Sequence, residues 1–367
     1  MKSKVFFAKL GSEPKKDLLK RIGELLELLE LPSKVRKGDL CAVKVHFGER
    51  GNTSFVRPLL LRPIVQKLKE AGGRPFLTDT NTLYAGGRSE AVSHLETALQ
   101  HGFCQETVGA PVIIADGLWG NASVQVEIPG EIYREVSIAH TIYYADCLVA
   151  VSHFKGHDLA GFGGALKNLG MGCASRKGKL EQHSEVKPRV KPKKCKGCGR
   201  CIQWCAHGAI SLKGDKAWID EERCVGCGEC IVICPDRAIR IDWKTDPGLF
   251  QRKMVEYAMG ALRGKEGKAF FLNFLLQITP YCDCYPSSDA PIVGDIGVLA
   301  SLDPVAIDQA SVDLVNAQPG NPSSRCRGLG RGDDKFRALH EGVDWEVQLS
   351  YAERLGLGTR GYDLVDL

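Results

Sequence analysis

CKGCGRCIQWCAHGAISL (residues 195–212) and CVGCGECIVICPDRAIRI (residues 224–241) align with each other without a gap. Each run holds four cysteines in the spacing C-x-x-C-x-x-C-x-x-x-C, and the second run begins 29 residues after the first. The similarity continues past the last cysteine of each run, so a whole structural unit is duplicated and not only a cysteine spacing. The middle of the chain is therefore predicted to fold as two equivalent halves.

The cysteine spacing is that of a bacterial-type ferredoxin module with two 4Fe-4S clusters. In this arrangement the first three cysteines of one run bind one cluster, and the fourth binds the other cluster. The predicted ligands are Cys195, Cys198, Cys201 and Cys234 for cluster one, and Cys224, Cys227, Cys230 and Cys205 for cluster two. Glycines at 197, 199, 226 and 228 let the ligand loops wrap tightly. A pair of zinc sites is the alternative, but zinc sites seldom show three such close spacings twice.

The bulk composition is ordinary for a soluble, cytoplasmic protein. The 367 residues are enough for two or three domains, and a net charge of +5 gives no case for binding nucleic acid or a membrane. We expect no export signal, because the apolar run Val5 to Ala8 is short, and no membrane helix, because Ala269 to Ile278 falls short of roughly 20 residues. Fifteen cysteines in such a chain favour metal ligation over disulfides.

Outside the cysteine runs the chain alternates strand-like and helix-like segments. Before the module we expect strands at 5–8, 41–47, 75–80 and 146–152, helices at 14–31 and 59–71, and a hairpin formed by 124–128 and 132–138. After it we expect a helix at 247–262, strands at 269–277 and 292–299, and a helix at 304–315. This rhythm predicts an α/β core, a mostly parallel sheet with helices on both faces.

The module is predicted to be an insert in this core. The basic, proline-containing stretch KPRVKPKK at 187–194 has the composition of a linker. We therefore predict one α/β core made of residues 1–187 and 244–367, interrupted by an α+β ferredoxin-like domain with two 4Fe-4S clusters at 188–243.

Three polar, glycine-rich stretches are predicted to lie at strand ends. They are KVHFGERGNTSFVRP at 44–58, SHFKGHDLAGFGGALKNLGMGCASRKGK at 152–179, and YCDCYPSSDAPIVGDIGVLASLDPVAIDQA at 281–310. Open α/β sheets bind ligands beyond the carboxyl ends of their strands, so we expect one composite pocket. In these stretches the chain resembles the uncharacterised iron-sulfur-centre protein family (domain of unknown function 362), whose core commonly carries a ferredoxin insert. The resemblance covers nearly the whole chain and implies no settled substrate or reaction.

The stretch at 152–179 holds most of the candidate chemistry. The candidates for catalysis are His153, Lys155, His157 and Lys167. Further candidates for the substrate pocket are His46, Asn52, Arg57, Asn168 and Asp295. The basic side chains suit a phosphate or carboxylate, but the glycine spacing fits neither a P-loop nor a dinucleotide fingerprint. The alternative is that the glycines form turns and the basic residues are solvated or dock an acidic partner.

Cysteines outside the module suggest a third metal site in the core. Cys282 and Cys284 lie at a predicted strand end, and together with Cys173 and His183 they offer thiolate and imidazole ligands to one ion. Free cysteines are also common in protein cores, because the thiol behaves as a small hydrophobic group. The sequence leaves both interpretations open.

Three functions fit these features. The first is a ferredoxin-coupled oxidoreductase, in which a redox partner protein supplies electrons that pass through the clusters to a small anionic substrate or a metal in the core pocket. The second is a non-catalytic electron-transfer adapter for a partner redox enzyme. The third is a factor that delivers a metal or a cluster. Replacing Cys282 and Cys284 by Ala should abolish the activity of the enzyme, spare the adapter, and remove transferable metal from the delivery factor.

Overall fold

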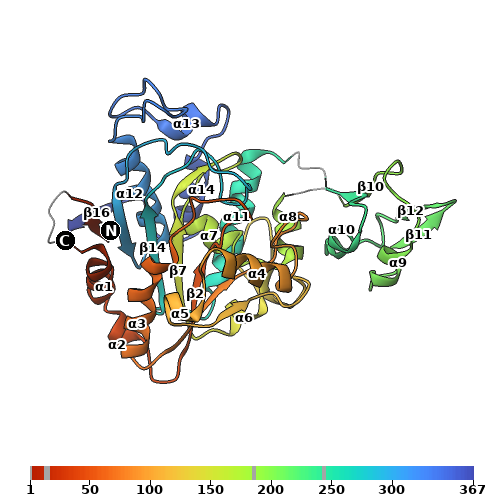
Figure 1. The fold of residues 1–367 in the computed structure, drawn as a ribbon, viewed down its shortest axis with the longest axis horizontal. Coiled ribbons are helices and arrows are strands. Elements are labelled where there is room, and N and C mark those ends of the chain that lie inside the picture. Colours follow the sequence, from red (N-terminus) through yellow and green to blue (C-terminus); the bar gives the residue numbers. More distant parts are fainter. Residues whose placement is uncertain (1, 12–16, 184–186, 242–244) are drawn as a thin grey trace.

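The computed structural model describes residues 2–11, 17–183, 187–241 and 245–367, which are built around a central eight-stranded sheet (Figure 1). The strand order is β16 (Tyr362–Asp366), β1 (Ser3–Lys9), β15 (Gly297–Ser301), β14 (Ala269–Leu275), β7 (Cys147–His153), β2 (Leu40–Val45), β3 (Arg74–Asp79) and β4 (Val112–Ile114). Strands β4, β3, β2, β7 and β14 are parallel, and β1 is parallel to β16. Strand β15 is antiparallel to both of its neighbours. The predicted mostly parallel sheet is confirmed.

Segments from both sides of the cysteine runs share this sheet. Strand β14 follows the runs in sequence, yet it pairs with β7, which precedes them, and Leu272 lies opposite Val151. Strand β15 likewise pairs with β1, with Leu299 opposite Phe7. Strands β7 and β14 are buried along nearly their whole length. Continuous apolar strands of this kind are typical of a parallel sheet that is covered on both faces.

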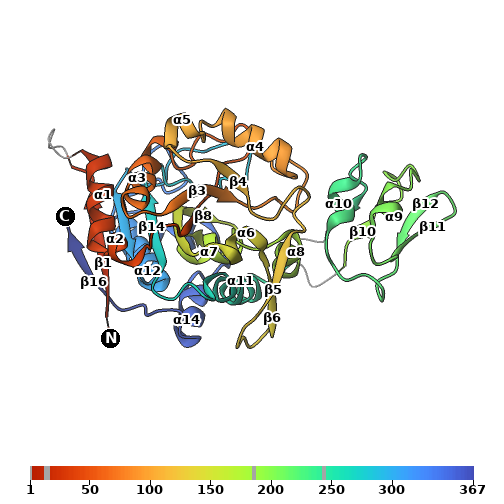
Figure 2. The ribbon, with the colours of Figure 1, turned by 90° about the horizontal axis from the view of Figure 1, so that it is seen from below.

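Helices cover both faces of the sheet (Figure 2). One face carries α1 (Leu18–Leu28), α2 (Leu31–Lys34), the short 3₁₀ helix η1 (Pro58–Leu61), α3 (Arg62–Glu70), α4 (Ala91–Gln100) and α5 (Gln105–Val108). The other carries α7 (Ala165–Gly170), α11 (Pro247–Leu262), α12 (Pro304–Asn316) and α14 (Glu346–Arg354). The remaining core helices are α6 (His140–Tyr144), α8 (Arg176–His183) and α13 (Lys335–Leu339). None of the helices in the described parts of the chain has both the length and the apolar character needed to cross a membrane.

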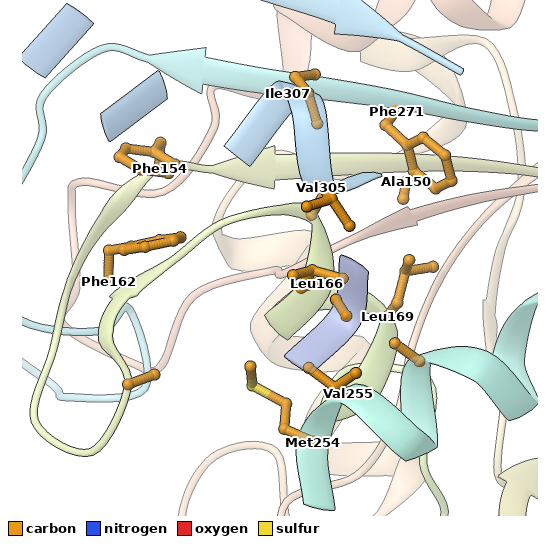
Figure 3. Packing of buried hydrophobic residues seen from close by; sticks show 14 of the residues in the cluster. Ala150, Phe154, Phe162, Leu166, Leu169, Met254, Val255, Phe271, Val305 and Ile307 are labelled. Atoms are coloured by element: carbon orange, nitrogen blue, oxygen red, sulfur yellow. The ribbon is translucent and has the colours of Figure 1, made fainter. Parts of the chain in front are cut away.

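The hydrophobic cluster on the second face holds α7 against the sheet (Figure 3). Ala150 of β7 and Phe271 of β14 point from the sheet toward Leu166 of α7, and Val255 of α11 and Ile307 of α12 complete the cluster. All five side chains are almost fully buried. Truncating one large member, such as Phe271, to Ala would cost about 3–5 kcal/mol.

A buried carboxylate fixes the start of α7. Asp308 accepts hydrogen bonds from Ala165 N at 2.7 Å, from Leu166 N at 2.9 Å and from Asn273 Nδ2 at 2.7 Å. Burial raises the pKa of Asp308 to about 6, although these donors oppose the shift. A Cβ atom on Gly164 would lie 2.2 Å from Asp308 Oδ1, so only glycine fits at this approach. The first turn of α7 therefore has one fixed position relative to the sheet.

Four two-stranded sheets surround this core. The predicted hairpin is confirmed as β5 (Ser123–Glu127) and β6 (Glu135–Ala139), which pair antiparallel. A second hairpin is formed by β8 (Lys155–His157) and β9 (Gly161–Gly163). The cysteine-rich segment, residues 187–241, contains the pairs β10 (Arg189–Val190) with β13 (Ile239–Arg240) and β11 (Ile210–Lys213) with β12 (Lys216–Ile219), and the helices α9 (Arg200–Trp204) and α10 (Glu229–Ile233). This segment lies to one side of the core (Figure 1).

Some predicted boundaries differ from the structure. The predicted helix at 14–31 is shorter, because α1 begins at Leu18 and residues 12–16 lie outside the described residues. The strand predicted at 292–299 is β15, which begins only at Gly297. Residues 292–296 instead form a loop that returns from β14, held by the hydrogen bonds from Ile292 N to Ile278 O and from Ile296 N to Leu275 O. This loop is apolar because much of it is buried, which is why it resembles a strand in sequence.

Candidate functional site

A cavity of about 720 Å³ opens at the carboxyl ends of β2, β3 and β7. Residues from all three glycine-rich stretches line it, so the expected composite pocket is present. Of the residues predicted from the sequence, those that line the cavity are His46, His153, Lys155, His157, Lys167, Asn168, His183, Cys282 and Cys284.

One wall of the cavity is a network of buried ion pairs. Lys44 Nζ lies 2.9 Å from Asp79 Oδ1, and Arg88 Nη1 lies 3.2 Å from Asp79 Oδ2. Tyr84 OH donates to Glu49 Oε2 at 3.0 Å and accepts from Arg88 Nη2 at 2.9 Å. Burial alone would raise the pKa of Asp79, but the charge of Lys44 holds it well below its usual range. The charges of this wall largely neutralise one another.

A second buried carboxylate holds the loop that follows β14. His153 Nδ1 lies 2.8 Å from Asp283 Oδ1, and His153 Nε2 lies 2.9 Å from Leu276 O. Lys155 Nζ lies 3.2 Å from Asp283 Oδ2. Burial opposes ionisation, but His153 and Lys155 hold the pKa of Asp283 well below its usual range. Both ring nitrogens of His153 face acceptors, so this predicted catalytic residue is engaged in holding the loop in place.

The thiols of Cys282 and Cys284 flank that carboxylate and line the cavity. The two thiols lie close enough for each to shift the pKa of the other, and Lys167 Nζ lies 3.6 Å from Cys282 Sγ. The neighbouring Cys284 thiol and the charge of Lys167 hold the pKa of Cys282 well below its usual range, although burial opposes this. The neighbouring Cys282 sulfur, together with burial, raises the pKa of Cys284 well above its usual range. An ammonium group close to the sulfur favours the thiolate form of Cys282, as at reactive cysteines.

Lys179 supplies a further cation to the cavity. Its Nζ donates to Thr80 Oγ1 and, at 2.7 Å, to Ala174 O. Burial lowers the pKa of Lys179 to about 8. Both hydrogen-bond partners are neutral oxygens, so no carboxylate among the described residues is hydrogen-bonded to this ammonium group.

Three histidines of the cavity are neutral. Burial lowers the pKa of His46 and of His157 well below the usual range, and it lowers the pKa of His183 to about 3. Nδ1 of His157 accepts from the backbone N–H groups of Leu159 and Ala160, at 3.2 Å each. These rings therefore add hydrogen-bonding surface to the cavity without adding positive charge.

The structure places three of the predicted pocket residues elsewhere. Asn52 is buried and donates to Tyr285 O at 3.2 Å, so it ties two loops together. Arg57 is exposed at the start of η1. Asp295 is also exposed, and its Oδ1 accepts from Gln277 N at 2.6 Å. A polar residue after a strand can turn toward the cavity, the solvent or a neighbouring loop, and the sequence does not distinguish these directions.

The four residues proposed as a third metal site lie in two different environments. Cys282, Cys284 and His183 line the cavity, whereas Cys173 lies in the hydrophobic core with its Sγ 3.6 Å from Asn168 O. The ring of His183 packs on Phe250, with centroids 4.9 Å apart. Within residues 2–11, 17–183, 187–241 and 245–367, no three His, Cys, Asp or Glu side chains form a group that could hold one metal ion.

The segment from Asp79 to Arg88 is the part of the cavity that the sequence analysis missed. It follows β3 and contributes Asp79, Tyr84 and Arg88 to the charged wall. A signal was present, because Asp-Thr-Asn-Thr at 79–82 is a polar run at the end of a predicted strand. Lys44 was a second signal, since a charged residue inside the apolar run 41–47 needs a buried partner.

The cysteine-rich segment contains two smaller cavities. The first is lined by Cys195, Cys198, Cys201 and Cys234. The second is lined by Cys205, Cys224, Cys227 and Cys230. Each cavity therefore takes three cysteines from one run and the fourth from the other. These two sets are called the outer set and the inner set below, because the inner set contains the loop nearer to the core.

Backbone groups in these loops point at cysteine sulfur. Cys195 Sγ accepts from Gly197 N and Ala217 N, both at 3.4 Å, and Cys234 Sγ accepts from Ala238 N at 3.2 Å. The four loop glycines, at 197, 199, 226 and 228, have φ between 69° and 74°. This left-handed conformation favours glycine, so the predicted need for tight wrapping is confirmed.

The inner set lies against helix α8 of the core. A Cβ atom on Gly228 would lie 3.2 Å from Leu83 Cδ1 and 3.5 Å from Arg176 Cγ. Leu83 also lines the large cavity, and Leu180 of α8 belongs to the hydrophobic cluster of the cysteine-rich segment. Figures 1 and 2 both show α10 on the side of the segment that faces α8. Because Lys179 and His183 of α8 line the large cavity, this one helix contacts both sites.

The chain matches one protein family and is similar in structure to known proteins. A family model described as Domain of unknown function (DUF362) matches residues 41–313. A search of curated proteins finds no match. The lactate racemase apoprotein from Thermoanaerobacterium thermosaccharolyticum is similar in structure, with 15% identity and a TM-score of 0.37, over 75% of this chain and 51% of that one. A structural-genomics protein from Thermotoga maritima has 15% identity and a TM-score of 0.39, over 70% and 50%. The chain thus spans about half the length of each.

Proposed function

The chain belongs to the DUF362 family, whose description names no activity, and we propose from the chemistry of its sites that the protein is an iron-sulfur oxidoreductase. The cysteine-rich segment is an inserted ferredoxin domain that binds two 4Fe-4S clusters, and electrons pass from it to the cavity of the α/β core. The cavity binds a small anionic substrate.

The observation that carries this proposal is the exchange of the fourth cysteine between the two runs. Cys234 lines the cavity of the first run, and Cys205 lines the cavity of the second. Two-cluster ferredoxins use this same exchange. Two separate zinc sites would not need it, because each run already holds four cysteines of its own.

The surroundings of the sulfurs fit this cofactor. Backbone N–H groups donate to Cys195, Cys205 and Cys234 sulfur, and such bonds stabilise negative charge on a thiolate ligand. When bound, 4Fe-4S clusters would supply single electrons. The outer set includes the exposed Cys198, so it is open to a donor, while the inner set lies against Leu83 and Arg176. This order supports transfer from the outer set, through the inner set, toward the large cavity.

The lining of the large cavity supports an anionic substrate. In the described part of the chain, Lys179 donates its hydrogen bonds to the neutral oxygens of Thr80 and Ala174, and Lys167 Nζ lies 3.6 Å from Cys282 Sγ. These two ammonium groups can orient a carboxylate or phosphate in a partly desolvated site, where charge interactions are stronger than in water.

The test is the metal and sulfide content of the full chain, prepared without oxygen. We expect about eight irons and about eight acid-labile sulfides per chain, as two 4Fe-4S clusters require. Cys198→Ser and Cys227→Ser should each lower both contents to about half, because each removes a ligand of one cluster only. Two zinc ions without sulfide would overturn the proposal.

One observation favours a second candidate, the non-catalytic electron-transfer adapter. Exposed basic residues precede and surround the outer set, namely Arg189, Lys191, Lys193, Lys194, Lys196 and Arg200. Such a surface suits an acidic redox partner. An adapter would relay electrons between two proteins at an undiminished rate after replacement of Cys282 and Cys284, whereas the enzyme would lose its reaction.

A further inference from the structure

Two pairs of cysteines in the described part of the core are neighbours, and the pairs differ in their surroundings. Cys41 and Cys147 lie opposite each other on adjacent strands, within the hydrophobic cluster on one face of the sheet. Cys282 and Cys284 are two residues apart on the loop after β14, and both line the large cavity. The second pair is therefore open to a small molecule, while the first is packed among apolar side chains.

The charges around the second pair suit a nucleophile. Lys167 Nζ lies 3.6 Å from Cys282 Sγ, and Lys155 also contributes positive charge at this sulfur. Asp283, between the two cysteines, is held by His153 and Lys155, so the loop has a fixed conformation. A thiolate beside an ammonium group and a second thiol is the arrangement that thiol–disulfide exchange requires.

We propose that Cys282 and Cys284 form a redox-active dithiol that reduces small anionic disulfides, with Cys282 as the attacking residue. The Cys282 thiolate attacks one sulfur of the substrate disulfide, the substrate S–S bond breaks, and the first thiolate leaves. Cys284 then attacks the sulfur of Cys282 in the mixed disulfide, and the second thiolate leaves. The proton of Cys284 passes to a leaving thiolate. The substrate has gained two electrons, and the protein holds a disulfide between Cys282 and Cys284.

The return to the dithiol rests on the proposed function. The protein disulfide must accept two electrons and one proton to give the Cys282 thiolate and the Cys284 thiol. The reductant class that this step needs is a pair of one-electron donors. The proposed clusters match it in number, because two clusters with one electron each supply the pair.

We expect a preference for an anionic disulfide because two lysines of the cavity are not paired with a carboxylate among the described residues in the way that the other two are. Lys44 and Lys155 are each paired with a buried carboxylate. Among the described residues, the hydrogen bonds of Lys179 go to neutral oxygens, and the sulfur beside Lys167 becomes neutral once Cys282 enters a disulfide. These two ammonium groups can therefore accept negative charge from the substrate, in addition to the charges of Asp116 near Lys179 and Asp283 near Lys167.

The first experiment follows the thiols of the full chain. The reduced protein is titrated with glutathione disulfide without oxygen, alkylated after unfolding, and digested with trypsin. The peptide 269–325 contains Cys282 and Cys284 and no other cysteine. We expect this peptide to lose two hydrogens and to carry no alkyl group, while Cys41 and Cys147 remain fully alkylated. Two alkylated sulfurs in this peptide, or a bound glutathione that is not released, would overturn the dithiol.

Matched variants assign the roles. Cys284→Ser should stop after the first attack and retain one glutathione on Cys282, whereas Cys282→Ser should not react. The control is Cys41→Ala combined with Cys147→Ala, which removes the other thiol pair and should react at the wild-type rate. A loss of reaction in this control, with the fold shown intact by circular dichroism, would contradict the assignment to Cys282 and Cys284.

Three probes test the charge preference. We expect glutathione disulfide, an anion, to react faster than the neutral hydroxyethyl disulfide and much faster than the cationic cystamine. Lys179→Met should reduce the difference in reaction rate between the anionic and the neutral disulfide, and Lys179→Arg should restore this difference. Equal rates with all three disulfides would show that the site does not prefer anionic substrates.

The second experiment separates this inference from the proposed function. The protein disulfide is formed first, and light with a deazaflavin then supplies single electrons. We expect two thiols to reappear per chain, and none in a variant that carries both Cys198→Ser and Cys227→Ser. If the disulfide forms and is never reduced by this route, the proposed electron path is wrong and the redox-active dithiol is retained. If the iron and sulfide contents are as expected but no disulfide forms, the dithiol is wrong and the proposed clusters are retained.

Discussion

The two cysteine runs have the same backbone and different neighbours. Gly199 and Gly228 occupy equivalent positions, each with φ of 74°, and each begins a helix. A Cβ atom on Gly199 would meet nothing within 4 Å, whereas one on Gly228 would touch Leu83 and Arg176 of the core. The duplicated unit is therefore used once as a free loop and once as a docked loop. Position on the core, and not cysteine spacing, distinguishes the two halves.

The side chains between the cysteines differ accordingly. Lys196 and Arg200 are exposed, and the equivalent positions in the second run hold Val225 and Glu229. Glu229 accepts a hydrogen bond from Asn121 of the core at 3.0 Å. The first run thus offers cationic side chains to a partner, whereas in the second run Glu229 contacts the core and Val225 is exposed. The same duplicated backbone thus exposes one loop to a partner and packs the other loop against the core.

The largest effect should come from breaking the inner set. We expect Cys227→Ser to reduce transfer of electrons to the Cys282 and Cys284 disulfide to the background rate, because the loop that contacts the core would lose a ligand of its proposed cluster. Cys198→Ser should retain transfer when a small dye supplies the electrons, since the dye can reach the inner set directly. The measurement is the appearance of thiols in the peptide 269–325 under light-driven reduction. Equal losses of electron transfer in both variants would show that electrons do not pass from the outer set through the inner set to the cavity.

Substitutions of the equivalent glycines Gly199 and Gly228 test the contact between the second run and the core. Gly199→Ala should cost about 1–2 kcal/mol of unfolding free energy, the penalty for a side chain in the left-handed region. Gly228→Ala should cost a further 1–3 kcal/mol or so, because its Cβ would also press on Leu83. Chemical denaturation of both variants, followed by circular dichroism and by the absorbance of the proposed clusters, measures the difference. Identical midpoints would mean that the contact with Leu83 contributes nothing.

The exposed basic side chains around the outer set should govern the rate of reduction by an acidic electron donor. We expect Lys196→Glu with Arg200→Glu to slow reduction by such a donor by about tenfold or more at low salt. The effect should fade near 1 M salt, where charges are screened beyond about 3 Å. Stopped-flow reduction at several salt concentrations tests this, with Glu229→Lys as a control in the inner half. A salt-independent difference would point to a structural cause.

The smallest effect concerns Lys179, which lies on the helix that contacts the inner half. Its pKa of about 8 means that the ammonium loses its proton as the pH rises through 8, so binding of an anionic probe should weaken by about tenfold between pH 7 and 9. The unfolded chain binds this proton up to about pH 10.4. Stability should therefore rise with pH between about 8 and 10.4. Lys179→Met should remove both trends in titrations of anion affinity and unfolding.

The sequence predicted the sheet and most of its elements because these follow from local patterns. The helix at 247–262 has the predicted bounds, and β7 lies within one residue of the predicted strand, since long apolar runs leave few alternatives. The order of the strands did not follow from the sequence, because β14 and β15 pair with strands more than a hundred residues away.

The candidate site was predicted in part for a similar reason. His46, Lys155, Lys167 and Asn168 reach the cavity, because parallel strands bring their carboxyl ends to one edge. Asn52, Arg57 and Asp295 do not reach it, because loops turn after the strand ends. Tyr84 and Arg88 were missed because only the position of β3 beside β2 brings the segment after it to the cavity.

The chain leaves the core and re-enters it at one place. Thr245 Oγ1 donates a hydrogen bond to His183 O, so the residues on either side of the cysteine-rich segment touch each other. A loop whose ends already meet adds little constraint to the fold that it interrupts. The same core could therefore exist without the segment or accept another one in its place. Because α8 ends at His183, which lines the large cavity, any such replacement would begin close to this cavity.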